Sequence, residues 1–278
     1  MDIGLLTAPF GNKSLEWVID WAGKNGFQAL EVAAGPGSKH LDTNALTAAK
    51  AKEIRRRLAA AGVRISSLAF YTNLTEPDRA ARAQTGKAMR EVIRAAVILE
   101  VDVVCTLAGF PVPGKDRMQT IEQDLPGVMR PLLDSAGKQK VKLAFENYFA
   151  TNIMNLEHWW KVFELLPDAH LGLNFDPSHL HWQQIDYLEA VDLFRNRIFH
   201  THAKDVEIKR HTLSQVGNQS RGWWRYVIPG FGDINWGVYV ARLRSVGYNG
   251  VLSIEHEDSA FGAEEGFLKG QRHLAQYA

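Results

Sequence analysis

The stretch Leu171-Gly172-Leu173-Asn174-Phe175-Asp176-Pro177-Ser178-His179 joins an apolar segment to a turn that carries two metal-compatible side chains. Residues 171–175 predict a buried strand, and the Asp-Pro-Ser sequence after them ends it with turn chemistry. Asp176 and His179 are therefore expected at the carboxyl end of that strand. Apolar segments at 143–146, 198–202 and 251–255 also end at a residue whose side chain can bind a metal ion. Four strands thus bring one set of side chains to a common edge: Glu146, Asp176, His202 and Glu255.

Strand-like and helix-like segments alternate along the whole chain. The expected strands cover residues 3–8, 29–33, 63–70, 101–107, 143–146, 171–175, 198–202 and 251–255. The helical segments that follow them begin near residues 14, 43, 78, 116, 156, 186, 233 and 263. Strands that are separated each time by a helix pair in parallel through right-handed crossovers, and eight such units close a TIM barrel. The pattern therefore predicts a single (β/α)8 TIM barrel over residues 1–278.

An open doubly wound sheet is the alternative arrangement of alternating strands and helices. Such a sheet typically carries a glycine-rich dinucleotide-binding turn after its first strand. This chain has Thr7-Ala8-Pro9-Phe10-Gly11 at that place instead. The closed barrel is therefore favoured over the open sheet.

The composition is that of a globular protein with a full core. Of the 278 residues, 46% are hydrophobic and 23% are charged, and the formal net charge is +1. This balance gives no electrostatic basis for binding nucleic acid, which normally requires a clustered basic surface. Cys105 is the single cysteine, which excludes an internal disulfide, and its apolar flanks favour a buried structural thiol. The N-terminus lacks a signal-peptide layout and no run reaches membrane-spanning length, so we expect a cytoplasmic protein that binds neither nucleic acid nor membrane.

One connection, from about residue 206 to 232, is much longer than the others and is rich in glycine, tryptophan and arginine. In a barrel it would follow the seventh strand on the catalytic face, so we expect a lid over a substrate. Aromatic rings suit the C–H faces of a sugar, whereas imidazole and guanidinium groups suit its hydroxyls. The candidates of these kinds are Trp182, Trp223, Trp224, His179, His181 and Arg225. The alternative is that the tryptophans pack loops or an oligomer interface.

Three carboxylates and one imidazole form the set at the strand ends. Each residue alone could be a helix cap or a hydrogen-bonded structural side chain. Together the carboxylates repel one another, and a divalent ion removes that repulsion. Such an oxygen-rich set suits Mn²⁺, Mg²⁺ or Co²⁺ and differs from a thiolate-rich structural zinc site. We therefore predict that Glu146, Asp176, His202 and Glu255 bind one divalent metal ion.

Two of the expected ligands, Glu146 and Glu255, are glutamates from the fifth and eighth strands. Across a barrel mouth such a pair could flank a substrate, with one glutamate removing a proton from carbon and the other returning one. The metal would polarise the neighbouring carbonyl. Lys204 and Asp205 directly follow His202. They could orient that ligand, touch the substrate or form a salt bridge at the rim.

Five motifs together resemble the xylose-isomerase-like TIM-barrel family of sugar phosphate isomerases and epimerases, which is distantly related to endonuclease IV. They are Glu146-Asn147, the Asp176-x-x-His179 turn, His202-Ala203-Lys204-Asp205, Gly230-Phe231-Gly232 and Ser253-Ile254-Glu255. The opening Gly4-Leu5-Leu6-Thr7 and Glu31 extend the resemblance over essentially the whole chain. The motifs taken together are specific to the superfamily, and they say little about the substrate.

The resemblance implies a metal and a set of roles. In ketose 3-epimerases of this family, the positions that match Glu146, Asp176, His202 and Glu255 bind one divalent metal, usually manganese. Mn²⁺ is therefore expected, with Mg²⁺, Co²⁺ or Zn²⁺ as alternatives. The two matching glutamates act as acid and base in those enzymes, and the positions that match His179 and Arg225 contact the substrate.

Endonuclease IV, with its trinuclear zinc site, is the DNA-repair alternative in the same superfamily. It has an Asp and a His just before the Gly-x-Gly segment, where this chain has Trp224 and Tyr226. It also has histidines at the third and fourth strand ends, and this chain has none there. Too few ligands remain for three metal ions, so DNA repair is disfavoured.

Three hypotheses for the function remain. The first is an isomerase or epimerase that abstracts a proton next to a ketose or keto-sugar carbonyl through an enediolate. The second is a lyase or deglycosidase that cleaves 3-keto-glycosides by β-elimination at the same metal site, in some relatives with a small partner subunit. The third is a non-catalytic sugar-binding barrel, which the intact glutamate pair disfavours. No glycine-rich phosphate cradle is evident, so we expect an unphosphorylated sugar as substrate. We also expect the protein to form a homo-oligomer.

Overall fold

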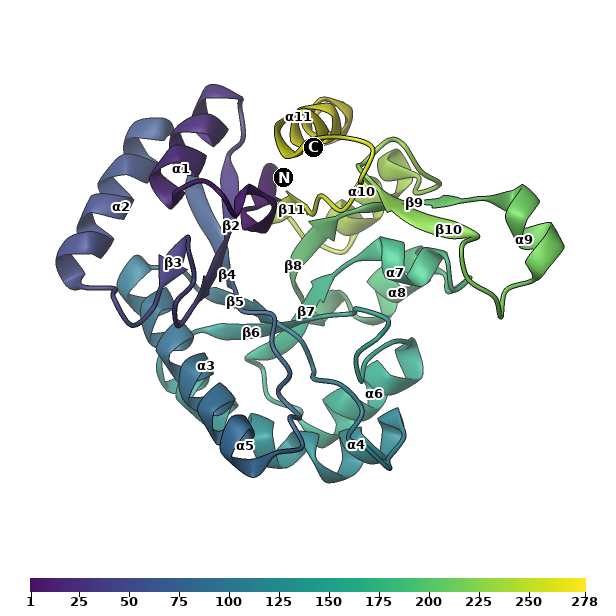
Figure 1. Cartoon of the computed structure of the whole chain (residues 1–278), viewed down its shortest axis with the longest axis horizontal. Helices are drawn as coiled ribbons and strands as arrows, with labels where there is room; N and C mark the ends of the chain where they lie inside the picture. The colour runs from purple at the N-terminus through teal and green to yellow at the C-terminus, as the bar shows by residue number, and fades with distance from the viewer.

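The computed structural model describes residues 1–278 and shows a closed barrel of eight parallel strands (Figure 1). The barrel strands are β1 (Asp2–Leu6), β2 (Ala29–Gly35), β4 (Arg64–Ala69), β5 (Val103–Thr106), β6 (Lys142–Glu146), β7 (Leu171–Phe175), β8 (Ile198–Ala203) and β11 (Val251–Ile254). They are paired in the order β1, β11, β8, β7, β6, β5, β4, β2, and the pairing of β1 with β2 closes the ring. The predicted single (β/α)8 TIM barrel is confirmed.

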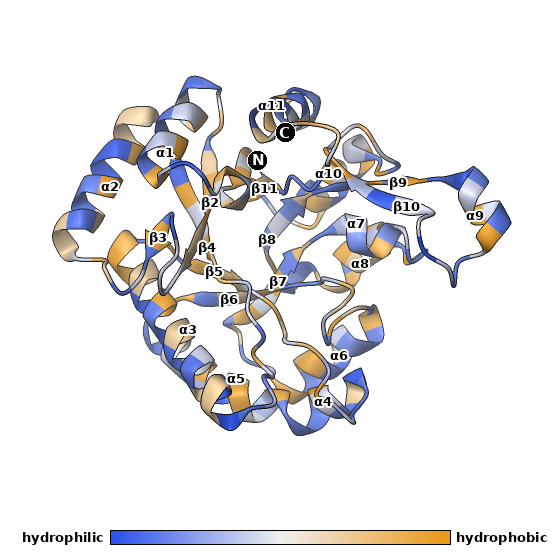
Figure 2. Cartoon of the chain, viewed as in Figure 1, coloured by the Kyte–Doolittle hydropathy of each residue, from blue (hydrophilic) through white to orange (hydrophobic).

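Helices surround the barrel and connect its strands (Figure 1). They are α1 (Leu15–Lys24), α2 (Ala48–Ala61), α3 (Arg79–Leu99), α4 (Arg117–Gln123), α5 (Leu125–Lys138), α6 (Leu156–Leu165), α7 (Pro177–His181), α8 (Tyr187–Leu193), α9 (Arg210–Val216), α10 (Trp236–Ser245) and α11 (Ala263–Leu274), with 3-10 helices η1 (Ala8–Phe10) and η2 (Arg195–Arg197). Hydrophilic and hydrophobic residues alternate along the outer helices (Figure 2), as expected for helices that bury one side. One cluster of 61 buried residues forms the core and fixes the strand ends. None of the helices combines the length and the apolar character needed to cross a membrane.

The residues expected to cap helices do so at several places. The Ser14 hydroxyl accepts a hydrogen bond from Trp17 N–H and begins α1, and Asp78 begins α3 in the same way. Gly62 ends α2 in the left-handed region, with φ of 68°. The expected start of this helix near residue 43 is wrong. Residues 41–42 pair with β2 as strand β3 (Leu41–Asp42), so the helix begins later, after its Thr47 cap.

The helix expected from residue 116 to 138 is two helices, α4 and α5. Asp116 and Gln119 form a reciprocal capping box at the start of α4. The chain breaks at Asp124, and Pro126 lies in the first turn of α5. A proline has no N–H to continue the hydrogen bonds of α4, but it is favoured at a helix start, so a second helix begins there.

Short elements replace the turn expected after β7 and the loop expected after β8. Asp176 caps α7 by accepting a hydrogen bond from Ser178 N–H at 2.8 Å, and Pro177 takes the first helical position. Residues 205–227 form an arm in which β9 (Asp205–Ile208) pairs antiparallel with β10 (Trp224–Val227) and α9 lies between them. The arm projects from the barrel (Figure 1). The long connection is therefore ordered structure.

Asp205 is buried where the arm meets the barrel. Its carboxylate accepts four hydrogen bonds of 2.8–3.0 Å, from the N–H groups of Val206, Gly230 and Ile234 and from Trp236 Nε1–H. A Cβ at Gly232 would lie 2.4 Å from Asp205 Oδ1, so only glycine fits there. Asp205 therefore folds residues 230–236 against β9. These four hydrogen bonds use the acceptor capacity of the carboxylate. Asp205 is therefore not the substrate contact that its position after Lys204 had suggested as one possibility.

We expect Asp205→Asn to lower the free energy of unfolding by about 2–4 kcal/mol, because an amide has one acceptor oxygen and turns its own NH₂ group toward the remaining buried donors. Chemical denaturation of the variant and the wild type measures the change. Asp20→Asn is the control, since Asp20 forms a solvent-exposed ion pair with Arg57 and should change stability by about 1 kcal/mol or less. Equal losses in the two variants would contradict the role given to Asp205.

Candidate metal centre

The four predicted ligands lie together at the carboxyl ends of the strands. Glu146 ends β6, Asp176 follows β7, His202 lies in β8 and Glu255 follows β11. One ligand atom from each residue lies within 4.8 Å of the ligand atoms of the other three. No member of the set is more than 9% exposed. The structure therefore brings together the set that the strand ends predict.

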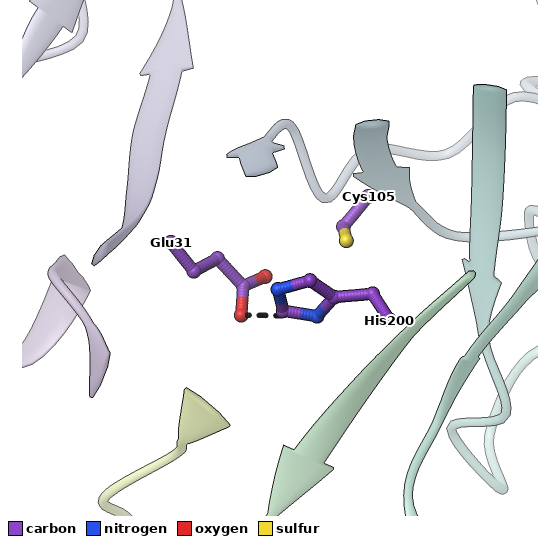
Figure 3. A group of neighbouring side chains, drawn as sticks. All are labelled: Glu31, Cys105 and His200. Atoms are coloured by element: carbon purple, nitrogen blue, oxygen red, sulfur yellow. Dashed lines mark ion pairs between the residues drawn. The ribbon is translucent and has the colours of Figure 1, made fainter. Parts of the chain in front are cut away.

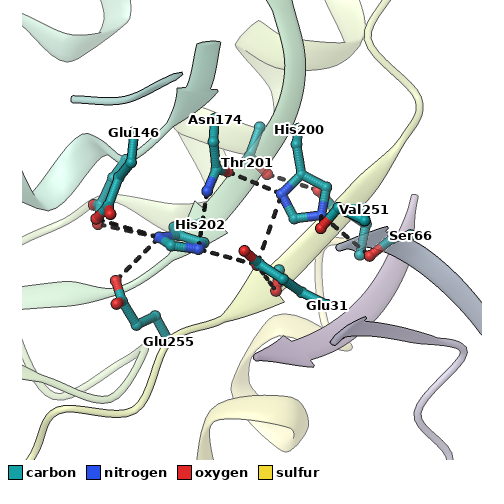
Figure 4. A network of polar contacts seen from close by, with 12 residues as sticks. Glu31, Ser66, Glu146, Asn174, His200, Thr201, His202, Val251 and Glu255 are labelled. Carbon is teal, nitrogen blue, oxygen red and sulfur yellow. Dashed lines mark hydrogen bonds and ion pairs between the residues drawn. The ribbon is translucent and has the colours of Figure 1, made fainter. Parts of the chain in front are cut away.

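Two buried polar atoms of this set make no hydrogen bond: His202 Nδ1, and Asp176 Oδ2, which lies 3.2 Å from Lys204 Nζ. His202 Nδ1 lies 3.0 Å from Glu255 Oε2, 3.5 Å from Glu146 Oε1 and 3.9 Å from Asp176 Oδ2. Figure 4 shows the His202 ring with this side toward the two glutamates. Buried polar atoms without partners are costly, and a cation among these atoms would satisfy all of them. The residues therefore fit a divalent ion with oxygen-rich coordination.

Cationic neighbours keep the two glutamates ionised. Burial acts to raise the pKa of Glu255, but its neighbours, Lys204 first, outweigh it and lower this pKa to about 2. Burial also opposes the ionisation of Glu146, but the hydrogen bond from His179 and the charge of Lys204 help to hold its pKa below the usual value. An ionised carboxylate is the form that binds a metal and the form that accepts a proton.

Lys204 is buried within the same group. Its Nζ lies 2.6 Å from Glu255 Oε2, 3.2 Å from Asp176 Oδ2 and 3.3 Å from Glu257 Oε2. It also lies 4.5 Å from the centre of the Tyr226 ring, in a cation–π contact. Burial acts to lower the pKa of Lys204, but these carboxylates, Glu255 first, raise it well above its usual value. Lys204 therefore places a positive charge beside the candidate ligands.

His179 is fully buried and links the candidate ligands to the arm. Its Nε2 lies 3.2 Å from Glu146 Oε1 and 3.2 Å from Lys204 Nζ. Its Nδ1 lies 2.5 Å from the Tyr226 hydroxyl. A proton on Nε2 would face the Glu146 carboxylate, which leaves Nδ1 to accept the hydrogen bond of the Tyr226 hydroxyl. Strand β10 thus places the Tyr226 hydroxyl on the side of His179 that faces away from Glu146.

The tryptophans pack mainly on one another. The rings of Trp182 and Trp224 are stacked, with centroids 4.5 Å apart and 15° between their planes. Trp223 is buried and meets Trp182 edge-on at 6.0 Å. Because Trp182 and Trp224 cover one face of each other, only their opposite faces could meet a sugar. His181 lies apart from the candidate ligands, in a cavity of about 580 Å³ that is also lined by Trp182 and Trp223.

Arg225 ties the arm to the loop after β11. Its Nε lies 2.5 Å from Glu207 Oε2, and its Nη1 lies 3.0 Å from Asp258 Oδ1. The Asp258 side chain is 1% exposed, so this second ion pair is partly shielded from water. Arg225 lies between Trp224 and Tyr226 in β10. The Trp224 ring stacks on Trp182, and the Tyr226 hydroxyl contacts His179. The arrangement makes Arg225 an anchor of the arm, and its substrate contact stays a prediction.

We expect Arg225→Ala to raise the KM for substrate roughly fivefold with little change in metal affinity. The two ion pairs together are worth about 1 kcal/mol, and their loss loosens the strand that presents Trp224 and Tyr226. Steady-state kinetics and metal titration measure the two effects. Arg210→Ala is the control, because Arg210 pairs with Asp233 and its side chain is 76% exposed. A similar KM in both variants would contradict the anchoring role.

Glu31, Cys105 and His200 form a second group of metal-type side chains (Figure 3). Both nitrogens of His200 have partners: Nδ1 contacts Asn174 Oδ1 at 2.9 Å, and Nε2 contacts two serine hydroxyls of β4. Burial lowers the pKa of His200 to about 4 and raises that of the Cys105 thiol. Both nitrogens of His200 are used in hydrogen bonds within the protein, so this group lacks the free imidazole nitrogen that a metal site requires. Cys105 is buried, as expected from its apolar flanks.

The sequence did not predict the contacts that several residues make with the candidate ligands or with Lys204. Glu31 Oε2 and the Tyr71 hydroxyl each lie 3.0 Å from His202 Nε2. Glu257 contacts Lys204 from the loop after β11. For Glu31 the sequence does contain a signal, because it is an acidic residue within the apolar run of residues 29–33 and a buried charge requires partners. The sequence has no comparable signal for Tyr71 or Glu257, whose partners lie far away along the chain.

Comparison with known proteins adds sequence relatives. Residues 19–277 match the family described as xylose isomerase-like TIM barrel. The uncharacterized protein YfiH of Bacillus subtilis is 25% identical, and the alignment covers 99% of each chain. An inosose dehydratase of Clostridium perfringens is 30% identical over 132 residues, which cover 45% of this chain and 44% of that protein.

Solved structures share the fold. An IolI protein with a bound zinc atom has a TM-score of 0.79 and 18% sequence identity, covering 100% of this chain and 99% of that one. A D-psicose 3-epimerase determined in the presence of D-fructose has a TM-score of 0.73 and 16% identity, covering 100% and 92%. Identities at this level show the common fold alone. Because the family match spans nearly the whole sequence, the chain belongs to the xylose isomerase-like TIM barrel family.

Proposed function

We propose that this protein is a sugar isomerase or epimerase that uses one divalent metal ion and removes a proton next to the carbonyl of an unphosphorylated ketose or keto-sugar. The observation that carries the proposal is the pair of ionised glutamates around His202 Nδ1, with Glu255 Oε2 at 3.0 Å and Glu146 Oε1 at 3.5 Å. The two glutamates come from β6 and β11, which are separated in the barrel by β7 and β8. Two carboxylates that approach from different strands could act on opposite sides of one carbon.

Glu146, Asp176, His202 and Glu255 would hold the metal ion. When bound, the ion would polarise the substrate carbonyl and stabilise the negative charge that develops on its oxygen. Three carboxylates and one imidazole suit Mn²⁺, which we propose as the natural ion, with Mg²⁺ and Co²⁺ as alternatives. Zn²⁺ is a further alternative, because the IolI protein of the same fold binds zinc.

Lys204 and His179 supply the other polar groups of the proposed site. The Lys204 ammonium is buried, so its charge would act strongly on a substrate oxygen nearby. His179 would hold Glu146 through Nε2, at 3.2 Å from Glu146 Oε1, or would donate to a substrate hydroxyl. Trp182, Trp224 and the arm would exclude water from the reacting carbon.

β-Elimination is the second candidate function, and the inosose dehydratase among the relatives supports it. The same base would remove the proton, a double bond would form, and the oxygen on the next carbon would leave as water or an alcohol after receiving a proton. Two contacts favour this alternative: His179 Nε2 lies 3.2 Å from Lys204 Nζ, and His179 Nδ1 lies 2.5 Å from the Tyr226 hydroxyl. Proton-bearing groups therefore lie beside Glu146, where they could protonate a leaving oxygen.

Deuterium uptake from heavy water tests the proposal. The Mn²⁺-loaded protein is incubated with ketohexoses, inososes and 3-keto-glucosides, the metal is removed, and the sugars are examined by NMR. We expect one deuterium at a carbon next to the carbonyl, without release of water or an aglycone. Release of either product would assign β-elimination instead. No exchange and no release with any of these substrates would contradict both functions.

A further inference from the structure

We propose that Glu31 is a positioning residue, which keeps the proton of His202 on Nε2 and thereby leaves Nδ1 free to bind a metal ion. The inference rests on the proposed metal site. It goes beyond that site because Glu31 comes from β2 and lies outside the proposed ligand set.

The two nitrogens of His202 face different surroundings (Figure 4). Nδ1 faces Glu146 and Glu255, whereas Nε2 lies 3.0 Å from Glu31 Oε2. His202 and Glu31 are both 0% exposed, so bulk water does not compete for these contacts. A metal ion binds the neutral imidazole, which carries one proton, and the nitrogen that keeps this proton cannot bind the metal. The partner of Nε2 therefore determines whether Nδ1 is available.

Two further donors hold Glu31 as an acceptor. The Ser253 hydroxyl donates to Oε2 at 2.8 Å, and the Tyr71 hydroxyl donates to Oε1. An ionised carboxylate has no proton of its own to donate, so the 3.0 Å contact between Glu31 Oε2 and His202 Nε2 requires the proton on the histidine. A carboxylate that accepts from the far nitrogen of a metal-binding histidine fixes its tautomer and the orientation of its ring.

Asn174 offers the competing arrangement. Its Oδ1 lies 2.9 Å from His200 Nδ1, and this contact fixes the orientation of the amide group. Its Nδ2 therefore lies on the other side, 3.0 Å from the Tyr71 hydroxyl and 3.0 Å from His202 Nε2. An amide N–H that points at Nε2 favours the opposite tautomer, with the proton on Nδ1. With Glu31 in place, Tyr71 donates to Glu31 and its oxygen can accept from Asn174. Glu31 therefore decides between two hydrogen-bond arrangements of the same residues.

Glu31→Gln should reverse this choice. The new amide can turn its NH₂ group toward His202 Nε2, where it joins the Asn174 amide as a second donor. The proton then moves to Nδ1, and a metal ion must displace it before it can bind. We expect the affinity for Mn²⁺ and Zn²⁺ to fall about 10- to 100-fold.

Tyr71→Phe disturbs the same arrangement without removing a buried charge. It takes away the donor to Glu31 Oε1 and leaves Asn174 Nδ2 with His202 Nε2 as its remaining partner. We expect about a tenfold loss of metal affinity in this variant. It also decides the question if Glu31→Gln fails to fold.

The test is titration of metal-free protein with Mn²⁺ and with Zn²⁺, in the wild type and in Glu31→Gln, Tyr71→Phe and Cys105→Ala. Cys105→Ala is the matched control, because Cys105 is buried beside Glu31 and His200 (Figure 3) but takes no part in these hydrogen bonds. A ¹⁵N NMR spectrum of the histidines in the Zn²⁺-loaded wild type is a second readout. It should show the His202 proton on Nε2 and the metal on Nδ1.

The outcomes separate this inference from the proposed function. Weaker binding in folded Glu31→Gln, with wild-type binding in Cys105→Ala, supports the positioning role. Metal affinity within twofold of wild type in folded Glu31→Gln would overturn it, as would a wild-type spectrum with zinc on Nε2. If Glu31→Gln does not fold, the same two outcomes are read from Tyr71→Phe. A wild type that binds neither ion would overturn the proposed metal site itself, and the inference with it.

Discussion

Glu146→Gln and Glu255→Gln, each assayed with saturating Mn²⁺, should turn over their sugar substrate about 10²- to 10⁴-fold more slowly than the wild type. An amide oxygen can still coordinate a metal ion, but it cannot accept a proton from carbon. Both carboxylates are held ionised in the structure, which is the state that a base requires. Steady-state kinetics, with metal occupancy measured in the same samples, gives the result.

Asp176→Asn is the matched control for this experiment. Asp176 is a proposed ligand of the same chemical type, but it caps α7 and has no proposed role in proton transfer. We expect this variant to bind metal more weakly and to recover most of its activity when excess metal is added. Recovery to near wild-type rates in both glutamate variants would remove the two-carboxylate mechanism and leave another side chain, such as His179, as the base.

Removal of the metal by exhaustive chelation should lower the turnover rate by about 10³-fold or more, because polarisation of the carbonyl is worth several kcal/mol in the transition state. Addition of Mn²⁺ should restore the rate. The barrel should stay folded throughout, since its strands are joined by backbone hydrogen bonds and its core of 61 buried residues does not include the four ligands. Circular dichroism before and after chelation checks this point.

Zn²⁺, Mg²⁺ and Co²⁺ added to the chelated protein would rank the alternative ions by activity. A chelated protein with less than one tenth of an ion per chain and an unchanged rate would contradict metal dependence. Loss of the circular dichroism signal on chelation would instead show that the ion supports the fold.

The sequence predicts the barrel well because its signals are local. Most strands are largely apolar and several helices begin with a capping residue, so Ser14 and Asp78 could be assigned from their neighbours alone. The arm of β9, α9 and β10 could not be predicted in this way. Its order depends on Asp205, whose carboxylate accepts hydrogen bonds from residues 25 to 31 positions farther along the chain. No local pattern reports such a contact.

The same distinction holds for the candidate site. Glu146, Asp176, His202 and Glu255 could be grouped because each lies within one residue of the end of a strand, and parallel strands end at one edge of a barrel. The partners of these residues follow no such rule. Glu31 meets His202 across 171 residues of sequence, and Tyr226 meets His179 across 47. Their roles depend on side-chain directions, which become visible only when the barrel has closed.

Anomalous scattering from crystals grown with Mn²⁺ is the most direct test of the central claim, that one divalent ion binds at the four strand ends. The claim predicts a single strong peak per chain, coordinated by oxygens of Glu146, Asp176 and Glu255 at about 2.0–2.4 Å and by His202 Nδ1. A peak elsewhere, or no peak at this position in crystals saturated with Mn²⁺, would contradict it.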